Sequence, residues 1–400
     1  MLKSNIAWMK KNVPSDLKVW KGMIQDIDWS QVAAKTKLSL QRDKDRITAE
    51  FKEFAAMDTS AKIDWLMNGD RHLGYLYKKD AIAFARREWK GLKSVGYDFV
   101  GWLKIWGGML NMVMKDPMSI MLAVFEYHWF ASYLATPAVV DRSVFGRRGK
   151  LLQADFDMWV AITHWAEDLI ANLIMADAKI GGNQKINKRI IMFDEMTMAQ
   201  MMAGFPNLLG IPYQMIPVFM VSEMDQLTLI PYIDAIESYG LPSDTCPLPT
   251  AECGCAVKDE YPMCGQGFIA SSMPCDGSVM ATSFQDRRFS KFMPSYPLCM
   301  PVRYDDEDTT EMAAADMKDC IHWVEGLTGE TWNWDTYFAT MEKMNECTRL
   351  EMEKWEINKT HYPQLVGSSF ELFRKWNYEM DGGLFPEGLK TQRKICKTMM

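Results

Sequence analysis

The chain has 400 residues, of which 48% are hydrophobic and 24% charged, a composition that excludes global disorder. Its 52 Asp and Glu residues outnumber its 45 Lys and Arg residues, so the formal net charge is −7. An acidic chain without a basic tract is not expected to have nucleic acid as its main partner. Nine cysteines are too few for a disulfide scaffold.

The first 180 residues are predicted to form a helical region. Residues 60–67, 80–92 and 155–178 place apolar side chains at three- and four-residue spacing beside charged faces. Residues 1–13 contain three lysines but no continuous apolar stretch, so no signal peptide is expected there. We therefore expect a cytoplasmic protein whose cysteines are reduced.

Residues 118–140 are apolar over roughly the length of a membrane span. Glu126 and His128 lie in the middle of this stretch, and ionisable groups at the centre of a bilayer are costly. The sequence therefore favours a buried helix here, and no association with a membrane is expected.

Residues 181–400 are predicted to form an α/β domain, because short β-rich runs alternate with helical patterns, which is typical of a parallel sheet with crossover helices. We expect Gly210 and Pro212 to end the first of these helices, and residues 334–378 to be mainly helical. The expected strands are 189–193, 214–221, 267–271 and 296–302, and the expected helices are 194–205, 223–239, one starting near Asp276, and 308–327.

The cysteines are unevenly distributed, since none precedes Cys246. Cys275 directly follows the predicted strand 267–271, and Cys246 lies in the loop after the preceding helix. Ligands of open parallel sheets bind beyond the carboxyl ends of the strands, so these two cysteines are predicted to meet at a functional edge. A metal or cluster site and unrelated reduced thiols both remain open. The absence of Cys-x-x-Cys excludes zinc-ribbon and simple ferredoxin sites.

Two short motifs surround these cysteines: Asp-Thr-Cys-Pro at 244–247, behind a Gly-Leu-Pro turn, and Pro-Cys-Asp-Gly at 274–277, behind an apolar strand. A third feature is the run from 301 to 346, which contains an acidic stretch and a long helix. In this order, they resemble the D-component family of 2-hydroxyacyl-CoA dehydratases, which includes subunits of ATP-dependent benzoyl-CoA reductases. The resemblance extends from about residue 189 to the C-terminus.

The resemblance implies two flavodoxin-like domains and a 4Fe–4S cluster held by three cysteines, of which Cys246 and Cys275 would be two. It also implies a second related subunit and an ATP-hydrolysing activator protein that donates one electron at low potential. That electron would reduce the thioester of an acyl-CoA. The reaction would be 2-hydroxyacyl-CoA dehydration, the work of a lyase, or benzoyl-CoA-type ring reduction by an oxidoreductase, in anaerobic chemistry.

The chain departs from the family pattern in its length, because the third ligand normally comes from a second α/β domain. Only 125 residues follow Cys275, so the second domain is expected to be missing. We expect either a truncated chain or a divergent subunit, and the alternative function is a non-catalytic structural partner that has lost the cluster. Cys255 or Cys264 would be substitutes for the third ligand, whereas Cys396 near the terminus would be a poor one.

Other residues are weaker candidates, and each has a structural interpretation. Acidic residues at helix starts could orient substrate or complement helix dipoles. Serines beside Cys275 could donate hydrogen bonds to cluster sulfurs, and neighbouring arginines could meet CoA phosphates or form a solvated face. There is no P-loop for ATP and no spaced histidine pair. These candidates are Glu195, Glu223, Ser271, Ser272, Arg287 and Arg288.

Overall fold

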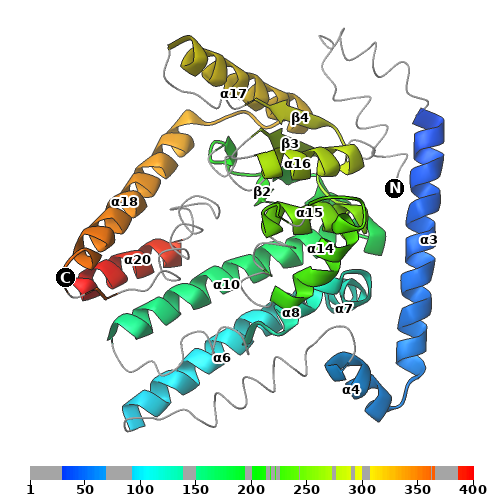
Figure 1. The fold of residues 1–400 in the computed structure, drawn as a ribbon, viewed down its shortest axis with the longest axis horizontal. Helices are drawn as coiled ribbons and strands as arrows, with labels where there is room; N and C mark the ends of the chain where they lie inside the picture. The colour runs from blue at the N-terminus through cyan, green and yellow to red at the C-terminus, as the bar shows by residue number, and fades with distance from the viewer. Residues whose placement is uncertain are drawn as a thin grey trace.

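In the computed structural model of the protein, long helices lie beside a small parallel sheet (Figure 1). The structure describes residues 29–68, 92–137, 150–193, 201–212, 217, 221, 226–242, 244–272, 276–289, 293–299, 307–361, 363–364 and 386–400.

The sheet has four described strands in the order β2-β1-β3-β4, and every neighbouring pair is parallel. They are β1 (Ile190–Phe193), β2 (Leu209–Pro212), β3 (Gly267–Ser271) and β4 (Ser295–Leu298). This is the strand order of flavodoxin-like sheets. The predicted α/β class is therefore confirmed, together with three of the four predicted strands.

Strand β1 is buried along its whole length because helices cover both faces of the sheet. Its alternate side chains serve two cores: Ile190 and Met192 belong to the larger core, which the long helices of the N-terminal region share. Ile191 and Phe193 belong to a second core beneath a helix that follows the sheet. A short continuous apolar run with no polar face is typical of a parallel strand covered on both sides.

The strand predicted at 214–221 lies almost wholly outside the described residues, whereas β2 occupies 209–212, where no strand was predicted, and contains both predicted helix breakers. Pro212 is tolerated because β2 is an edge strand of the described sheet, where a missing N–H need not interrupt a ladder. Gly210 is required by close approach: a Cβ there would lie 2.8 Å from Cγ of Met202 and 2.8 Å from Cε1 of Phe193.

The crossover helices follow the predicted alternation. Between β2 and β3 lie α14 (Ile230–Glu237) and α15 (Pro247–Val257), and between β3 and β4 lies α16 (Asp276–Phe289). Helix α17 (Glu307–Thr328) comes after β4 and matches the amphipathic pattern predicted for 308–327. It ends before Gly329, whose φ of +76° suits a residue without a Cβ.

The long helices form the other part of the fold. Helix α10 (Lys150–Ala176) lies at its centre, with α6 (Leu92–Lys115) along one side and α20 (Pro386–Met399) against another (Figure 1). The predicted helix 155–178 corresponds to α10, and 60–67 to α4 (Thr59–Asn68); 80–92 falls almost wholly outside the described residues. The remaining long helices are α3 (Trp29–Ala56), at the edge of the fold, and α18 (Trp334–Asn358), which packs on α20.

The apolar stretch 118–140 was predicted to be a buried helix, but its described residues form several short pieces. These are α7 (Pro117–Glu126), a 3₁₀ turn (His128–Phe130) and α8 (Ala131–Leu134). The side chains of Trp129 and Tyr133 are almost wholly buried, so this stretch fills the core. Within the described ranges, we find no helix with the length and apolarity of a membrane span.

The predicted division of the chain at residue 180 stays a prediction, and the largest core extends across it. That core contains Trp129 and Ile170 from the N-terminal part together with Phe268 and Ile395 from the C-terminal part. Helix α20, near the end of the sequence, packs against α10. The two parts therefore share one set of buried contacts.

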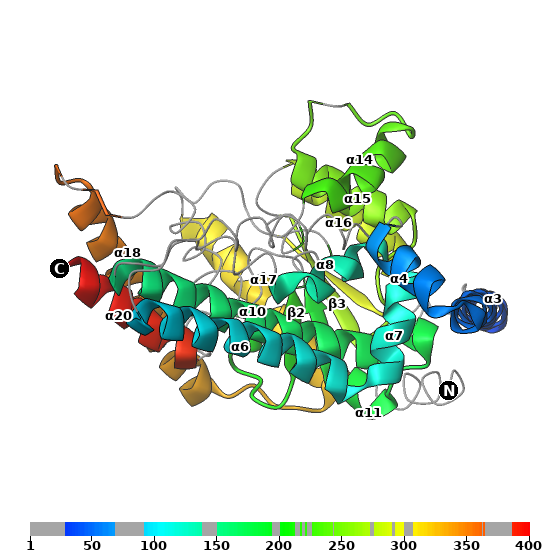
Figure 2. The same ribbon diagram turned by 90° about the horizontal axis from the view of Figure 1, so that it is seen from below.

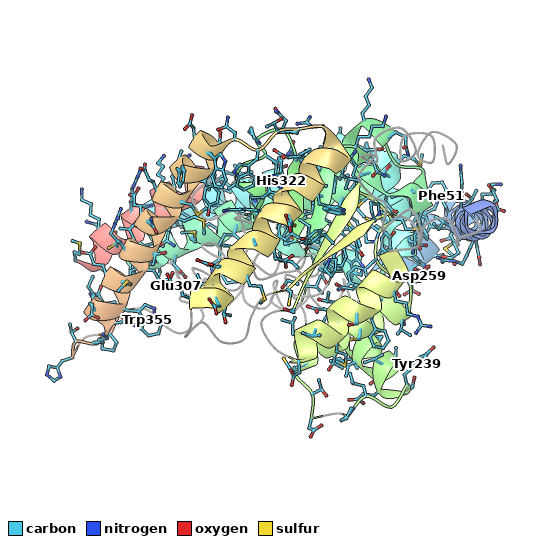
Figure 3. All side chains as sticks on the ribbon, turned by 90° about the horizontal axis from the view of Figure 1, so that it is seen from above. Phe51, Tyr239, Asp259, Glu307, His322 and Trp355 are labelled. Atoms are coloured by element: carbon cyan, nitrogen blue, oxygen red, sulfur yellow. The ribbon has the colours of Figure 1, made fainter. Side chains whose placement is uncertain are left out.

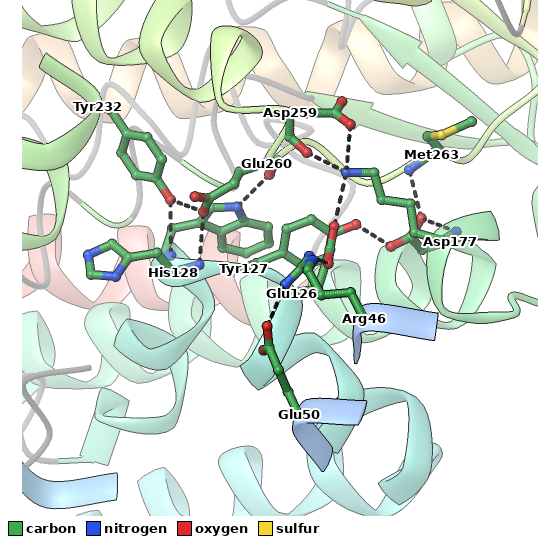
Figure 4. Close-up of polar contacts among 12 residues, drawn as sticks. Arg46, Glu50, Glu126, Tyr127, His128, Asp177, Tyr232, Asp259, Glu260 and Met263 are labelled. Atoms are coloured by element: carbon green, nitrogen blue, oxygen red, sulfur yellow. Dashed lines mark hydrogen bonds and ion pairs between the residues drawn. The ribbon is translucent and has the colours of Figure 1, made fainter. Parts of the chain in front are cut away.

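A buried polar network joins the long helices to the sheet (Figure 4). Lys179, before β1, donates to Glu126 of α7 at 3.1 Å and to the backbone carbonyl of Asp259. Asp177 accepts from the hydroxyl of Tyr127 and, at 2.7 Å, from the backbone N–H of Met263. Burial raises the pKa of Glu126 and of Asp177, although the nearby Lys179 ammonium group opposes the shift in both.

Candidate functional site

The strand order of the sheet reverses between β1 and β3, and the crevice at this point opens at the carboxyl edge of the sheet. In the order β2-β1-β3-β4, the chain passes from β1 to one side and returns to the other at β3. Flavodoxin-like sheets bind ligands in the crevice at this switch point. The sequence-predicted cysteines are therefore considered relative to the carboxyl ends of β1 and β3.

Cys246 lies at the start of α15, at the N-cap position, and is exposed. Its side chain makes no capping hydrogen bond, whereas its backbone carbonyl accepts from the hydroxyl of Thr250 at 2.8 Å. Pro247 occupies the first turn, where its missing N–H costs nothing. The exposed sulfur therefore lies at the positive end of a helix.

Helices α15 and α16 pack side by side and run in the same direction. Cys253 of α15 and Ala281 of α16 share a small core, and the Gln285 side-chain amide donates to the hydroxyl of Tyr261 at 3.0 Å, nearer the other end. At about 1.5 Å per residue, Cys246 and Asp276 lie roughly 10 and 8 Å from the shared core, toward the same end. Both helices therefore begin at the carboxyl edge of the sheet.

The base of α15 is held firmly, while its Cys246 end is exposed. Glu260, just beyond the helix, accepts from the hydroxyl of Tyr232 at 2.6 Å and from the backbone N–H of His128 at 2.9 Å. The indole N–H of Trp129 donates to the Glu260 carbonyl at 2.8 Å. In Figure 3, Asp259 lies beside the sheet, whereas Tyr239 of the α14 end lies farther out. The long helices therefore anchor this helical pair at one end.

The predicted ligand Cys275 lies outside the described residues, so its pairing with Cys246 stays a prediction. The structure describes the residues on either side. The backbone N–H of Ser272 donates to the carbonyl of Leu298 at 3.2 Å, which extends the β3–β4 ladder by one residue. Asp276 is the exposed first residue of α16.

The other cysteines that follow Cys246 closely are buried, which argues against a ligand role. Burial raises the pKa of Cys253 to about 12, with a further contribution from Glu252. Cys264 packs against the sulfur of Met192 at 3.8 Å, and burial raises its pKa well above the usual range. Cys255 is also buried. Thiols kept protonated in apolar surroundings are unreactive and bind metal poorly.

Cys299 was not singled out from the sequence, yet it occupies the same edge of the sheet. It is exposed and directly follows β4, the neighbour of β3. Its backbone N–H donates to one carboxylate oxygen of Asp316 at 2.7 Å, and the hydroxyl of Tyr296 donates to the other at 2.7 Å. The sequence placed Cys299 inside the predicted strand 296–302, so neither its position at the strand end nor the adjacency of β4 and β3 could be read from it.

The weaker candidates give a mixed picture. Glu195 and Glu223 lie outside the described residues. The side chain of Ser271 is buried, whereas Arg287 is exposed on α16. Among the residues that the structure describes, no three His, Cys, Asp or Glu side chains form a group that could hold a metal ion.

Two comparisons bear on this site. The family model for "2-hydroxyglutaryl-CoA dehydratase, D-component" matches residues 226–393, a segment that contains Cys246, Cys275 and Cys299. No curated protein matches the chain. The suspected resemblance to the D-component family of 2-hydroxyglutaryl-CoA dehydratase is therefore confirmed over residues 226–393.

Proposed function

We propose that this chain is a cytoplasmic iron–sulfur subunit of a radical acyl-CoA enzyme. Its complex would remove a 2-hydroxyl group from an acyl-CoA or reduce an aromatic acyl-CoA ring, after one-electron reduction of the thioester. The observation that carries the proposal is the parallel pair α15 and α16, whose first residues share the carboxyl edge of the sheet. Both candidate ligands adjoin those first residues, and the family match includes them.

The exposed cysteines at this edge have the chemistry that a 4Fe–4S cluster needs. Such clusters take Cys thiolates, and Cys246 offers an exposed sulfur at the positive end of a helix. Cys275 directly precedes Asp276, the first residue of α16, in the sequence. Cys246 and Cys275 are therefore proposed as two of the ligands.

We propose Cys299 as the third ligand, in preference to Cys255 and Cys264. It is an exposed thiol beyond the strand that pairs with β3, whereas the other two are buried. Asp316 holds the Cys299 backbone through its N–H at 2.7 Å, and this contact would fix the direction of the loop.

The bound cluster would supply an electron at low potential. The chain's own residues would position the thiols and leave a face for the substrate thioester beside them. Arg287, exposed on α16, would attract a CoA phosphate. The proposed partners are the acyl-CoA, a second related subunit, and an ATP-dependent activator protein that delivers the electron.

The test is anaerobic purification of the full chain, followed by measurement of iron and acid-labile sulfide. We expect about four of each per chain, and loss of both in Cys246→Ser and Cys275→Ser. Cys299→Ser should lose the cluster as well if Cys299 is the third ligand. Cys320→Ala is the matched control, because Cys320 is buried beneath the sheet on α17; it should keep its iron.

The outcomes separate the alternatives. Unchanged iron in Cys275→Ser would refute the ligand assignment. Iron retained in Cys299→Ser alone would refute Cys299 as the third ligand. Iron near zero in the parent chain after anaerobic reconstitution, with native circular dichroism, would support a structural partner that has lost the cluster.

A further inference from the structure

Helix α6 carries an unusual face, because large apolar side chains on it are exposed. Phe99, Leu103, Leu110 and Met114 are 59%, 48%, 52% and 70% exposed. The spacing of four, seven and four residues places them on one side of the helix. Val95, Val100 and Trp102 are also exposed on α6. We call Phe99, Leu103, Leu110 and Met114, with the exposed Gly107 among them, the outer face of α6.

The opposite side of α6 is already used. It packs on α10, where the hydroxyl of Tyr97 donates to the Gln153 carbonyl at 2.8 Å and His164 Nε2 lies 2.8 Å from the Lys104 carbonyl. Ile105 and Met112 are buried there. Figure 2 shows α6 in front of α10, with no described helix crossing in front of it. The helix is therefore apolar on two sides, and only one of them is buried within the described fold.

The side chains of the outer face are spaced symmetrically along the helix. Phe99 and Met114 are equally distant in sequence from the midpoint between Trp106 and Gly107, and so are Leu103 and Leu110. A two-fold axis at that midpoint would bring Phe99 opposite Met114 and Leu103 opposite Leu110 of another copy. In a two-fold interface, residue i meets residue j and residue j meets residue i. The spacing of this face meets that condition.

We propose that two copies of this chain associate through the outer face of α6, with the two α6 helices crossing antiparallel near Gly107. Gly107 has nothing within 4 Å of the position where a Cβ would lie, so the partner helix can approach closely there. Such small residues at helix crossings allow tight packing. The proposal is independent of the cluster and of the acyl-CoA chemistry.

The size of the face suits a dimer. Seven half-exposed large side chains on α6 amount to on the order of 600 Å² of apolar surface, above the few hundred Å² usual for a monomer. This approaches the roughly 800 Å² a side of a standard interface. The rings of Phe99 and Trp102 stack with centroids 6.2 Å apart, which gives part of the face a fixed shape.

The charges around the face favour a protein partner over a lipid surface. Helices that lie on membranes carry many cations on their polar side. Here Lys104 and Lys115 border the face, and Lys115 is paired with Asp168 at 2.7 Å. A membrane helix would turn the side opposite its apolar face to water. In α6, that opposite side packs against α10 instead.

The first test is the mass of the purified full chain by sedimentation equilibrium. We expect twice the chain mass, and at least about a tenfold weaker dimer in Leu103→Asp/Leu110→Asp, since like charges would then face each other. Met352→Asp on α18 is the matched control, because Met352 is 63% exposed on another helix; it should dimerise normally. A monomer at every concentration, or a dimer that the double variant leaves unchanged, would overturn the proposal.

A second test does not depend on disruptive variants. A Leu103→Cys chain is mixed with a Leu110→Cys chain and treated with a short bifunctional thiol cross-linker, and the linked peptides are identified by mass spectrometry. We expect links between 103 and 110, and few between 103 and 103, because those two lie about 10 Å apart along the antiparallel pair. Equal yields of the two links, or flotation of the monomer with phosphatidylcholine vesicles, would contradict a two-fold dimer.

Discussion

Lys179 Nζ lies 3.1 Å from Glu126 Oε1, and both side chains are almost fully buried. The contact joins the segment before β1 to α7, so it links the sheet to the long helices. Arg46 of α3 reaches the other oxygen of Glu126 from the surface. The attraction between two buried charges offsets the cost of removing them from water only while both are present.

We predict that Lys179→Met destabilises the protein by roughly 3–5 kcal/mol, because Glu126 would be left as a buried charge with weaker compensation. Glu126→Leu/Lys179→Met should recover much of that loss. The measurement is the free energy of unfolding in urea. Lys115→Met is the control, since its pair with Asp168 is partly exposed and should cost less than about 1 kcal/mol. Equal losses in the two single variants would contradict a special role for the buried pair.

Glu167 predicts a pH dependence of stability. Its side chain is buried on α10 and, among the described residues, neither carboxylate oxygen has a hydrogen-bond partner. Burial, with help from Asp168, raises its pKa to about 9 from an ordinary 4.5. The folded state therefore holds a proton that the unfolded state releases above pH 4.5. Stability should fall as pH rises from about 4.5 to 9.

Glu167→Gln should remove this dependence and stabilise the protein at pH 7 by up to roughly 3 kcal/mol, because the amide carries no charge to desolvate. Urea unfolding at several pH values measures both effects. Asp168→Asn, at an exposed position on the same helix, is the control and should retain most of the slope. A parent protein whose stability does not fall across this range would contradict the raised pKa.

Lys354 should produce the opposite slope. It is buried on α18 and donates to the side-chain oxygen of Gln392 on α20. Burial lowers its pKa from 10.5 to about 7, although neighbouring groups oppose the shift. Below that value the folded state holds a buried cation, whereas between pH 7 and 10.5 the unfolded state binds more protons, so this group makes stability rise with pH. The opposing groups are Glu351, Cys396, Cys347 and Asp155.

Lys354→Met should therefore stabilise the protein by roughly 2–4 kcal/mol at pH 6 and by less at pH 10. The measurement is again urea unfolding at the two pH values. The control is Lys359→Met, at an exposed position just after the end of α18. It should change neither value by more than about 0.5 kcal/mol. A loss of stability in Lys354→Met at both pH values would mean that the bond to Gln392 outweighs desolvation.

The parts of the fold that the sequence predicted correctly are those whose signals are local. The apolar run 267–271 became β3, and the pattern at 308–327 became α17. Strand β2 was missed because Gly210 and Pro212 are breakers by their own preferences. Their acceptance depends on an edge position and on the packing of Met202, which no short window of sequence contains.

The candidate site shows the same limit. Cys246 could be chosen because a motif surrounds it, whereas Cys299 could not, since its relevance comes from the pairing of β4 with β3. The burial of Cys264 is likewise a tertiary property, produced by contacts with Met192 and the segment before β1. Spacing along the chain identified the edge of the sheet, but not which thiols share it.

Two glycines on α6 give a final prediction about packing. A Cβ at Gly108 would lie 2.4 Å from Glu167 Oε2 and 2.2 Å from Cδ2 of His164, whereas a Cβ at Gly96 meets nothing within 4 Å. Gly108→Ala should therefore destabilise the protein by about 1–3 kcal/mol, because the packed side chains of His164 and Glu167 must move away. Gly96→Ala should instead stabilise it by about 0.5–1 kcal/mol, since alanine favours the helix. Thermal unfolding of the two variants measures the difference, and equal shifts of the same sign would mean that α6 does not lie this close to α10.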